Sequence, residues 1–253
     1  MGIKEKLPIS VCILVKNEEE NLRRALPPLS IFEEVLVYDS GSTDKSIEIC
    51  KSFGAKVNRG EWLGFPESRK KLFSLASQPW IFWLDADEVV TRNLSEELKV
   101  LFAQDTQADG IEINRMVFFL GKWIRHGEWF PDWNLRIFKS KGWLIVDQEV
   151  HESVHIPGKM IRLKSILEHH SYKDWDDRKA RIKKYSDLWA KMKSSNGQTV
   201  VFGEEYIRAS WRFFRAFCLK GGFLDGLFGL KIAISIASEV ILKYKKLRVL
   251  SSK

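Results

Sequence analysis

Two aspartates separated by one alanine, Asp85-Ala86-Asp87, follow a short apolar run, Trp80–Leu84. If that run is a buried strand, the carboxylates emerge at the edge of a sheet, and residues i and i+2 of an extended segment point to the same side. Two carboxylates placed in this way suit Mg²⁺ or Mn²⁺, which also bind phosphate oxygens. The motif therefore predicts a divalent cation held against a diphosphate. An acidic loop that caps the next helix is the plainer alternative.

A second polar cluster, Asp39–Asp44 (DSGSTD), follows the apolar run Glu34–Tyr38. The Asp39 carboxylate could accept hydrogen bonds from a nucleobase imide or a ribose hydroxyl, and a Ser/Gly turn exposes backbone N–H groups to anions. The same residues also suit a plain turn in which Asp or Thr caps the following helix. Alone, this cluster favours neither interpretation.

The first third of the chain alternates short apolar runs with amphipathic segments, which predicts a mostly parallel sheet flanked by helices. Ligands of such sheets bind at the carboxyl ends of the strands, where Lys16-Asn17-Glu18 and both aspartate clusters are expected. The expected strands are Ile9–Val15, Glu34–Tyr38, Lys56–Arg59 and Trp80–Leu84, and the expected helices are Asn17–Leu29, Thr43–Phe53 and Glu67–Ser77.

The remainder of the chain changes character twice. Gly110–Tyr172 is rich in tryptophan and β-branched residues and predicts antiparallel strands, and Asp174–Lys193 has helical periodicity. The tail, Val201–Lys253, is aromatic and basic, then apolar, then basic again. Charged residues interrupt its apolar stretch, so we expect amphipathic helices at a membrane surface rather than a membrane span. A helical hairpin buried against the rest of the chain is the alternative.

The composition is that of a globular protein, with a formal net charge of +8 that suggests an anionic partner. Nucleic acid is disfavoured because no RNP, KH, zinc or helix-turn-helix signature is present. The three cysteines form no CxxC pair, which favours a reducing compartment over a zinc site or a disulfide framework. The apolar run near the N-terminus is too short for a signal peptide.

The order of these motifs resembles that of family 2 inverting glycosyltransferases of the GT-A fold. The resemblance rests on LPISVCILVKNEEENLRRAL, VLVYDSGSTDKSIEI, WLGFPESRKKLFSLA and WIFWLDADE. It extends to lipopolysaccharide-core β-1,4-glucosyltransferases through FPDWNLRIFKSKGW, EVHESVH, LEHHSYKDW and GGFLDGLFGLKIAISIASEVILKY. It implies an α/β fold of the GT-A type, Rossmann-like with a mostly parallel sheet flanked by helices, and a helical, amphipathic C-terminal extension.

The resemblance also implies three regions and an activity. Residues 1–109 would form the nucleotide-sugar-binding half, residues 110–173 the acceptor side, and residues 174–253 a helical extension that associates with a membrane. The enzyme would transfer a hexose, glucose by resemblance, from a UDP-linked donor to a lipopolysaccharide-core or other lipid-linked acceptor. Such an enzyme would work in the cytoplasm, on the inner face of the bacterial inner membrane.

Site residues are implied by the same resemblance. The divalent cation, Mg²⁺ or Mn²⁺, would be held by Asp87, Asp85 and His169, with the neighbouring His170 as an alternative to His169. A histidine in this aromatic region could equally be structural. The residues expected at the donor are Val15, Lys16, Glu18, Asp39, Arg69, Asp85, Ala86 and Arg136.

Single displacement needs a general base for the acceptor hydroxyl. Many family members have a Glu-Asp pair at this point, whereas this chain reads Gln148-Glu149-Val150-His151-Glu152. Glu152 matches best and Glu149 is the second choice, with surface charge as the alternative for both. Among Trp123, Trp129 and Trp133 we expect at most one to contact a sugar and the others to pack in the core.

Other functions remain open at this point. A transferase to polyprenyl phosphate, to a capsular glycan or to a protein would have the same donor half. A non-enzymatic protein that binds anions or nucleic acid would share the basic charge, but the acidic strand-end clusters would repel phosphate unless a metal were bound.

Overall fold

The structure is a computed structural model that describes residues 6–148 and 151–251, and of residues 146–148, 151 and 152 it describes the backbone alone. The chain divides into two compact units. Unit 1 comprises Met1–Arg115 and Trp133–His170, and unit 2 comprises Met116–Asp132 and Ser171–Lys253. The expected boundaries at residues 109/110 and 173/174 stay predictions.

The alternation of strands and helices expected in the first third is confirmed. Helix α1 begins two residues later than expected because Asn17 has a left-handed φ of 56°, which no helix accommodates. Pro27 and Pro28 then impose a short 3-10 turn, η1. The elements are β1 (Leu7–Val15), α1 (Glu19–Ala25), η1 (Pro27–Ile31), β2 (Phe32–Asp39), α2 (Ser46–Ser52), β3 (Lys56–Arg59), α3 (Phe65–Ser74), β4 (Trp80–Asp85), β5 (Glu88–Val90) and α4 (Arg92–Ala103).

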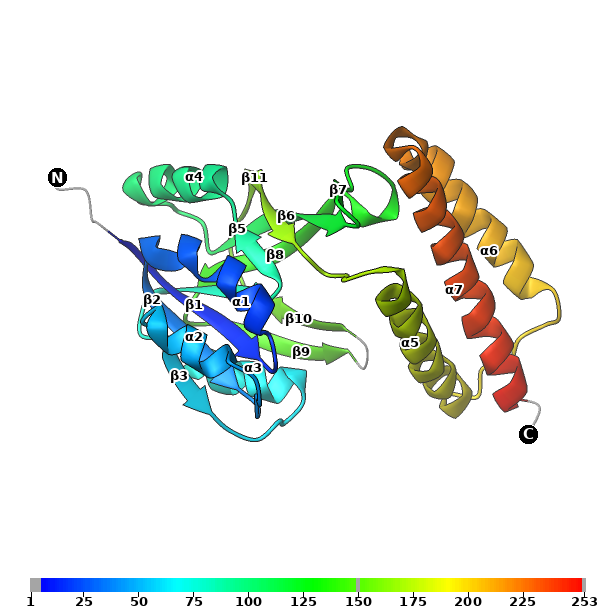
Figure 1. Cartoon of the computed structure of the whole chain (residues 1–253), viewed down its shortest axis with the longest axis horizontal. Coiled ribbons are helices and arrows are strands. Elements are labelled where there is room, and N and C mark those ends of the chain that lie inside the picture. Colours follow the sequence, from blue (N-terminus) through cyan, green and yellow to red (C-terminus); the bar gives the residue numbers. More distant parts are fainter. Residues whose placement is uncertain (1–5, 149–150, 252–253) are drawn as a thin grey trace. The chain divides into compact units, whose positions relative to one another are not determined.

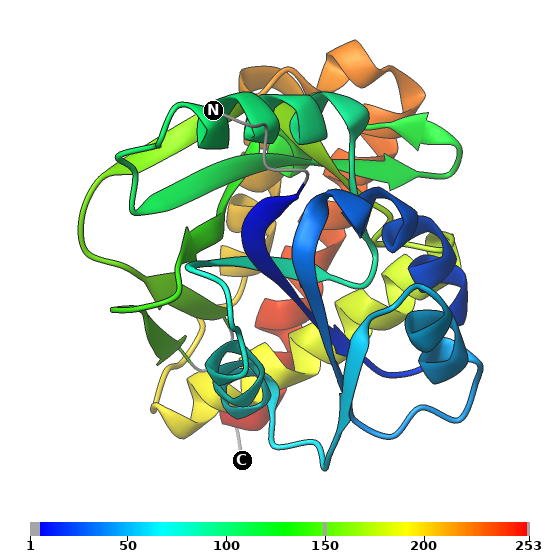
Figure 2. The same ribbon diagram turned by 90° about the vertical axis from the view of Figure 1, so that its left-hand side faces the viewer.

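The described residues form a nine-stranded sheet of order β3-β2-β1-β4-β8-β6-β11-β5, with β7 paired to β6. Strands β3, β2, β1 and β4 are parallel, as Figure 2 shows for β1 to β3. Antiparallel pairing joins β4 to β8 and β11 to β5. The strands of the middle region are β6 (Gly110–Phe119), β7 (Lys122–Trp123), β8 (Asp132–Lys139), β9 (Leu144–Gln148), β10 (His151–His155) and β11 (Met160–His169).

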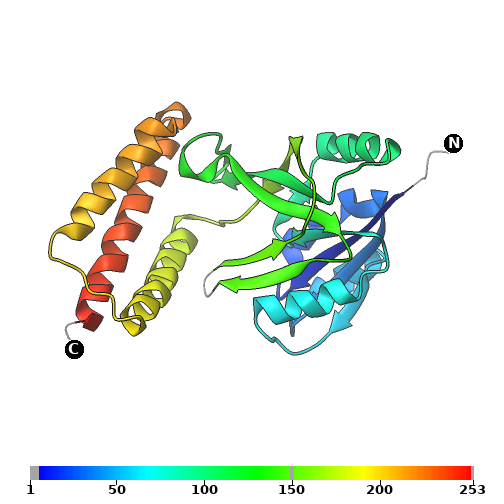
Figure 3. The same cartoon turned by 180° about the vertical axis from the view of Figure 1, so that it is seen from behind.

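Both faces of the parallel strands are buried in unit 1. Alternate residues of β1, such as Ile9 and Val11, pack with helices α1, α2 and α4 in one core cluster. Residues of opposite parity, such as Cys12, pack on the other face with helix α3 and the hairpin of β9 and β10. Figure 3 shows this hairpin (green) beside α3 (cyan). Unit 1 is therefore a three-layer α/β structure, which confirms the expected fold class.

Unit 2 has a separate core around the end of β6. Phe119 is fully buried among aromatic side chains. It belongs to the same core cluster as Ile232 and Ile236 of the last helix. In Figure 1 the two last helices, α6 and α7, lie side by side. The elements are η2 (Gly127–Trp129), α5 (Trp175–Ser195), α6 (Glu204–Phe214), the π-helical turn η3 (Arg215–Leu219), η4 (Gly222–Asp225) and α7 (Leu227–Ser251).

The two C-terminal helices expected from the tail are confirmed. Within the described part of the chain, no helix combines the length and the apolar character that crossing a membrane requires.

Candidate functional site

The carboxyl ends of the parallel strands bring the predicted polar residues to one edge of the sheet. In the strand register Val15 lies opposite Asp39, Asp39 lies opposite Arg59, and Leu14 lies opposite Asp85. Residues from three separate sequence motifs therefore end within one neighbourhood of unit 1. This is the edge at which open α/β sheets bind ligands.

Side chains bind the first two strand-end loops to each other. The Asn17 backbone N–H donates to Ser42 Oγ at 2.9 Å, and Thr43 N–H donates to Asn17 Oδ1 at 2.8 Å. The Glu18 N–H donates to Ser46 Oγ at 2.8 Å. Polar side chains thus hold the loops after β1 and β2 in fixed positions, although neither loop has regular structure.

Asp39 is almost wholly buried at the end of β2. Its carboxylate accepts hydrogen bonds from the backbone N–H groups of Gly41 at 3.2 Å and Ser42 at 3.1 Å, and Arg59 Nε lies 3.6 Å away. The expected turn at Asp39 is therefore present, but the N-cap of α2 is Lys45, which makes no side-chain cap hydrogen bond. A role of Asp39 in binding a nucleobase stays a prediction.

A pocket of about 280 Å³ opens beside these loops. Trp62 and Phe65, whose rings meet edge to face with centroids 4.7 Å apart, form an aromatic wall. Both rings are largely exposed, which is unusual for side chains of this size. The pocket is lined by Leu14, Val15, Lys16, Glu18, Ser40, Trp62 and Phe65. Three residues predicted for the donor, Val15, Lys16 and Glu18, are thus brought together.

The Asp85 carboxylate lies between two arginines. Arg69 approaches Oδ1 at 3.3 Å through both terminal nitrogens, and Arg136 donates to Oδ2 at 2.9 Å. Both guanidinium groups lie over the ring of Trp83, whose Nε1 donates to Asp85 Oδ1 at 3.3 Å. Burial alone would raise the pKa of Asp85, but Arg136 and then Arg69 outweigh it and hold that pKa below the ordinary value.

Glu88, which directly follows Asp85-Ala86-Asp87 and for which the sequence predicted no role, completes this cluster. Its carboxylate is fully buried, pairs with Arg136 and with Arg115 at 3.2 Å, and accepts the Asp85 backbone N–H at 3.0 Å. Burial and the neighbouring Asp85 carboxylate both raise the pKa of Glu88. Together they outweigh Arg136 and Arg115, which act to lower it. Glu88 therefore positions Arg136, one of the two arginines that contact Asp85.

Asp85 and Asp87 do not share one extended segment. Ala86 and Asp87 form a turn between β4 and β5, with Ala86 buried in the core. Asp87 Oδ2 instead lies 3.4 Å from His169 Nε2, because β11 pairs with β5 and brings His169 opposite Glu88. The argument from i and i+2 spacing is thus wrong in its geometry, since the turn gives the two carboxylates different partners.

Asp87 and His169 fit a divalent cation as a pair. Two ligands about 2.1 Å from an ion and at right angles would lie about 3 Å apart, close to the distance between their nearest atoms. Nδ1 of His169 is buried and has no hydrogen-bond partner in the described part of the chain. His170 pairs with Glu168 at 3.6 Å, and its backbone N–H donates to the Asp87 carbonyl at 2.8 Å. Among the described residues, no three His, Cys, Asp or Glu side chains form a metal site.

The side chains of the two residues predicted as the catalytic base are not among those that the structure describes. Glu149 lies outside the described residues. The backbone of Glu152 lies in β10, opposite Asp147 of β9, and its side chain is also outside the description. Both assignments stay predictions.

The three tryptophans of the middle region differ in their surroundings. Trp129 stacks on Tyr172 with centroids 5.1 Å apart in the core of unit 2, and Trp123 packs against Phe118. Trp133, in unit 1, lies under the guanidinium of Arg162 at 5.0 Å.

Sequence reasoning missed several residues of the site. Glu88 stood in the quoted segment WIFWLDADE without an assigned role, and Arg115 carries no motif and pairs with Glu88 across 27 residues. Trp62 and Phe65 stood in a quoted segment, and two large aromatic residues beside Gly64 could have indicated an exposed aromatic wall.

The chain is similar in sequence to known proteins. The sequence profile described as Glycosyl transferase family 2 matches residues 10–170. An uncharacterized glycosyltransferase of Rickettsia typhi is 28% identical over 257 residues, covering 97% of this chain and 88% of the relative. The lipopolysaccharide core biosynthesis glycosyltransferase LpsC of Rhizobium meliloti is 27% identical over 253 residues, covering 93% of this chain and 92% of LpsC.

Among solved structures, S. aureus TarS 1-349 in complex with UDP-GlcNAc is similar to this chain with a TM-score of 0.52. The alignment covers 97% of this chain and 91% of the TarS chain at 12% sequence identity. At this level of identity the likeness concerns the fold alone.

Proposed function

The chain belongs to glycosyl transferase family 2 and is a glycosyltransferase, and from this premise we propose that it moves a hexose from a nucleotide-sugar donor to a lipid-linked glycan acceptor. We propose glucose as the hexose, UDP as the nucleotide and inversion by single displacement as the mechanism. Two observations support the proposal: an aromatic-walled pocket lies at the carboxyl ends of β1 and β2, and Asp87, which follows the neighbouring strand β4, lies beside His169.

In this proposal the pocket holds the nucleoside. Trp62 and Phe65 offer aromatic faces to a base, while Glu18 and the strand-end loop at Ser40 offer oxygens to its N–H groups and to ribose. Lys16 supplies a positive charge for phosphate. Arg69 and Arg136 hold Asp85 toward the ribose or sugar side, and the buried position of Asp39 supports the loop on which the base would rest.

Asp87 and His169 would hold Mg²⁺ or Mn²⁺. Mg²⁺ commonly takes one or two protein ligands and completes its shell with water and substrate phosphates, so a two-residue site suits it. When bound, the cation would supply positive charge to the leaving diphosphate. The three guanidinium groups around Asp85 add no net positive charge, since they are matched by the three carboxylates Asp85, Asp87 and Glu88.

Glu152, or Glu149 as the second choice, would remove the proton from the acceptor hydroxyl. Glu149 precedes β10 in the sequence and Glu152 stands in it, and β10 pairs with β9 in a two-stranded sheet apart from the main one.

The acceptor class rests on the relatives. LpsC is named for lipopolysaccharide core biosynthesis, and we extend that class to this chain, with a place on the inner face of the bacterial inner membrane. Polyprenyl-phosphate, capsular and protein acceptors are the competing possibilities, and an acceptor panel separates them.

The test is a transfer assay with UDP-glucose and a panel of core, polyprenyl-phosphate and peptide acceptors, in Mg²⁺, Mn²⁺ or EDTA. We expect EDTA to abolish transfer, and Asp87→Asn to lower kcat about 100-fold or more while the protein stays folded. Glu152→Gln should abolish transfer and leave donor binding intact, and Glu149→Gln is its matched control.

Equal rates in EDTA and in Mg²⁺ would remove the metal from the proposal. Transfer of sugar only to a peptide acceptor would remove the lipid-linked acceptor. Near-normal turnover of Glu152→Gln together with loss in Glu149→Gln would exchange the two base assignments.

A further inference from the structure

The net positive charge of the chain comes from unit 2. This unit holds 20 of the 41 lysines and arginines but only 10 of the 33 acidic residues, which gives it a formal net charge of +10. Unit 1, with the candidate active site, has a formal net charge of −2. The anionic partner expected from the total charge therefore belongs to unit 2, and the donor diphosphate does not account for it.

Helix α6 presents two parallel stripes of side chains. Ile207, Trp211 and Phe214 follow the i, i+4, i+7 spacing of one helix face, and their exposed fractions are 75%, 55% and 46%. One residue further along at each step stand three arginines, Arg208 and Arg212 of α6 and Arg215 at the start of η3. We call these six residues the α6 surface.

Helix α7 has the more apolar sequence of the two helices, but some of its large apolar side chains are buried. Ile232 and Ile236 are 4% and 6% exposed and belong to the core of unit 2. These two residues of α7 are thus used within the protein, although Ile234 of the same helix is 50% exposed, whereas the apolar residues of the α6 surface all face outward. Exposed isoleucine and tryptophan at regular spacing form a contiguous patch rather than scattered apolar residues.

The arginines beside this patch have partners, but positive charge remains in excess. Glu128 alone faces Arg215 at 3.3 Å, Lys220 at 3.4 Å and Arg212 at 3.8 Å. One carboxylate cannot neutralise three cations, so this group carries about two positive charges beside the apolar stripe. Arg208 pairs with Glu204 at 2.6 Å.

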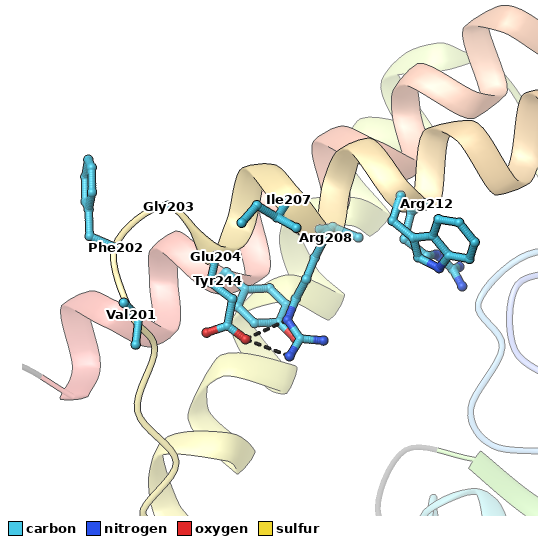
Figure 4. A pocket seen from close by; sticks show the side chains of 10 residues that line it. Val201, Phe202, Gly203, Glu204, Ile207, Arg208, Arg212 and Tyr244 are labelled. Atoms are coloured by element: carbon cyan, nitrogen blue, oxygen red, sulfur yellow. Dashed lines mark hydrogen bonds and ion pairs between the residues drawn. The ribbon is translucent and has the colours of Figure 1, made fainter.

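A groove of about 800 Å³ runs along the same side of unit 2 between α6 and α7. Ile207 and Trp211 line it from α6, and Val240 and Tyr244 line it from α7. Figure 4 shows Arg208 turned toward Glu204 and Tyr244, with Arg212 further along α6. The groove is mainly apolar and has guanidinium groups along it, which suits a molecule with an apolar tail and an anionic head.

We propose that the α6 surface is the membrane-contacting surface of the protein and inserts into the interfacial region of a bilayer that contains anionic lipids. Ile207, Trp211 and Phe214 enter the boundary between headgroups and acyl chains, and the arginines bind lipid phosphates. The charge asymmetry of the two units favours this occupant over a second copy of the chain, because two units of +10 repel each other. A lipid-linked acceptor, as in the proposed function, would be reached at this membrane surface. Only this statement about the acceptor rests on the proposed function.

The test uses the full chain and flotation with vesicles of phosphatidylcholine, with or without an equal amount of phosphatidylglycerol. We expect binding to the anionic vesicles, and for the double variant Ile207→Ser/Trp211→Ser on the order of ten-fold weaker binding. Arg212→Gln should weaken binding about five-fold, and only on anionic vesicles. The matched control is Val100→Ser/Leu188→Ser, whose side chains are 58% and 51% exposed on other helices, and it should bind like the unmodified chain.

Several results would overturn the inference: unmodified binding by Ile207→Ser/Trp211→Ser, equal binding to neutral and anionic vesicles, or no vesicle binding by the unmodified chain. A shift from dimer to monomer in the double variant, with unchanged vesicle binding, would assign the surface to a second copy instead. Vesicle binding needs neither donor nor acceptor, so its outcome is independent of the transfer assay. Metal-dependent hydrolysis of donor in solution should be unchanged in the double variant.

Discussion

Asp85 and Glu88 stand three residues apart, and both carboxylates reach the guanidinium of Arg136. Arg136 is 3% exposed at its side chain and lies between two negative groups, which raises its pKa further above the ordinary value despite its burial. Removal of the arginine would leave the fully buried Glu88 with Arg115 alone. Arg136 therefore serves both the stability of unit 1 and the placement of Asp85.

We predict that Arg136→Met lowers the free energy of unfolding by about 3–5 kcal/mol, because it leaves a buried carboxylate without its main partner. Urea unfolding followed by circular dichroism measures the change. Arg162→Met is the control, because Arg162 is 60% exposed in its pair with Glu112 and should cost about 1 kcal/mol or less. A double variant Arg136→Met/Glu88→Met should recover part of the loss, and a further loss of similar size would contradict the explanation.

At the scale of a single strand, β2 carries a buried acid at the end away from the active site. Glu34 accepts hydrogen bonds from Ser10 Oγ at 2.5 Å and the Ser77 N–H at 3.0 Å, and pairs with Lys56 at 2.7 Å. Burial acts to raise the pKa of Glu34, but the bonds from Lys56, Ser10 and Ser77 outweigh it and lower that pKa from 4.5 to about 2. Through these bonds the Glu34 carboxylate connects β1, β2, β3 and the loop before β4.

The sign of the pH effect follows from this depressed pKa. The contribution of Glu34 to stability is fully present above pH 4.5 and is lost as the pH falls toward 2, with an upper size of about 3 kcal/mol. Glu34→Gln should therefore unfold more easily at pH 7 and show a shallower decline of stability between pH 4.5 and 2. Denaturant unfolding at several pH values measures both slopes, with the exposed neighbour Glu33→Gln as control. Parallel slopes for Glu34→Gln and the unmodified chain would refute the assignment.

Elements whose signal is local could be predicted from the sequence. The strands at Leu7–Val15 and Trp80–Asp85 follow from short apolar runs, the polar clusters after them follow from turn residues, and their common edge follows from their parallel order. The geometry around Asp85 could not be predicted, because Arg136 and Glu88 meet through strand pairing across about 50 residues. Nor could sequence periodicity distinguish the buried apolar residues of α7 from the exposed ones of α6, since both helices carry apolar faces.

At the scale of the whole molecule, the units do not follow the order of the sequence. Residues Met116–Asp132 lie between two segments of unit 1 but belong to unit 2. Phe119 packs edge to face against Trp129 at 5.4 Å, Tyr172 at 5.6 Å and Trp175 at 4.9 Å. No compositional break marks this excursion, because a strand that continues from one unit into another keeps the same residue pattern throughout.

We predict from this arrangement that a chain ending at His170 does not yield a soluble unit 1. Val117, Phe119 and Ile124 would lose the partners that α6, η3 and α7 provide, and the lost burial amounts to roughly 5–9 kcal/mol. The truncated chain should be largely insoluble, and its soluble fraction should bind the dye ANS. Replacing Phe119 and Ile124 by serine in the truncated chain should increase its soluble yield, whereas the same replacements in the full chain should destabilise it. A truncated chain that stays soluble, binds no ANS and unfolds as cooperatively as the full chain would show that residues 116–132 do not depend on the C-terminal helices.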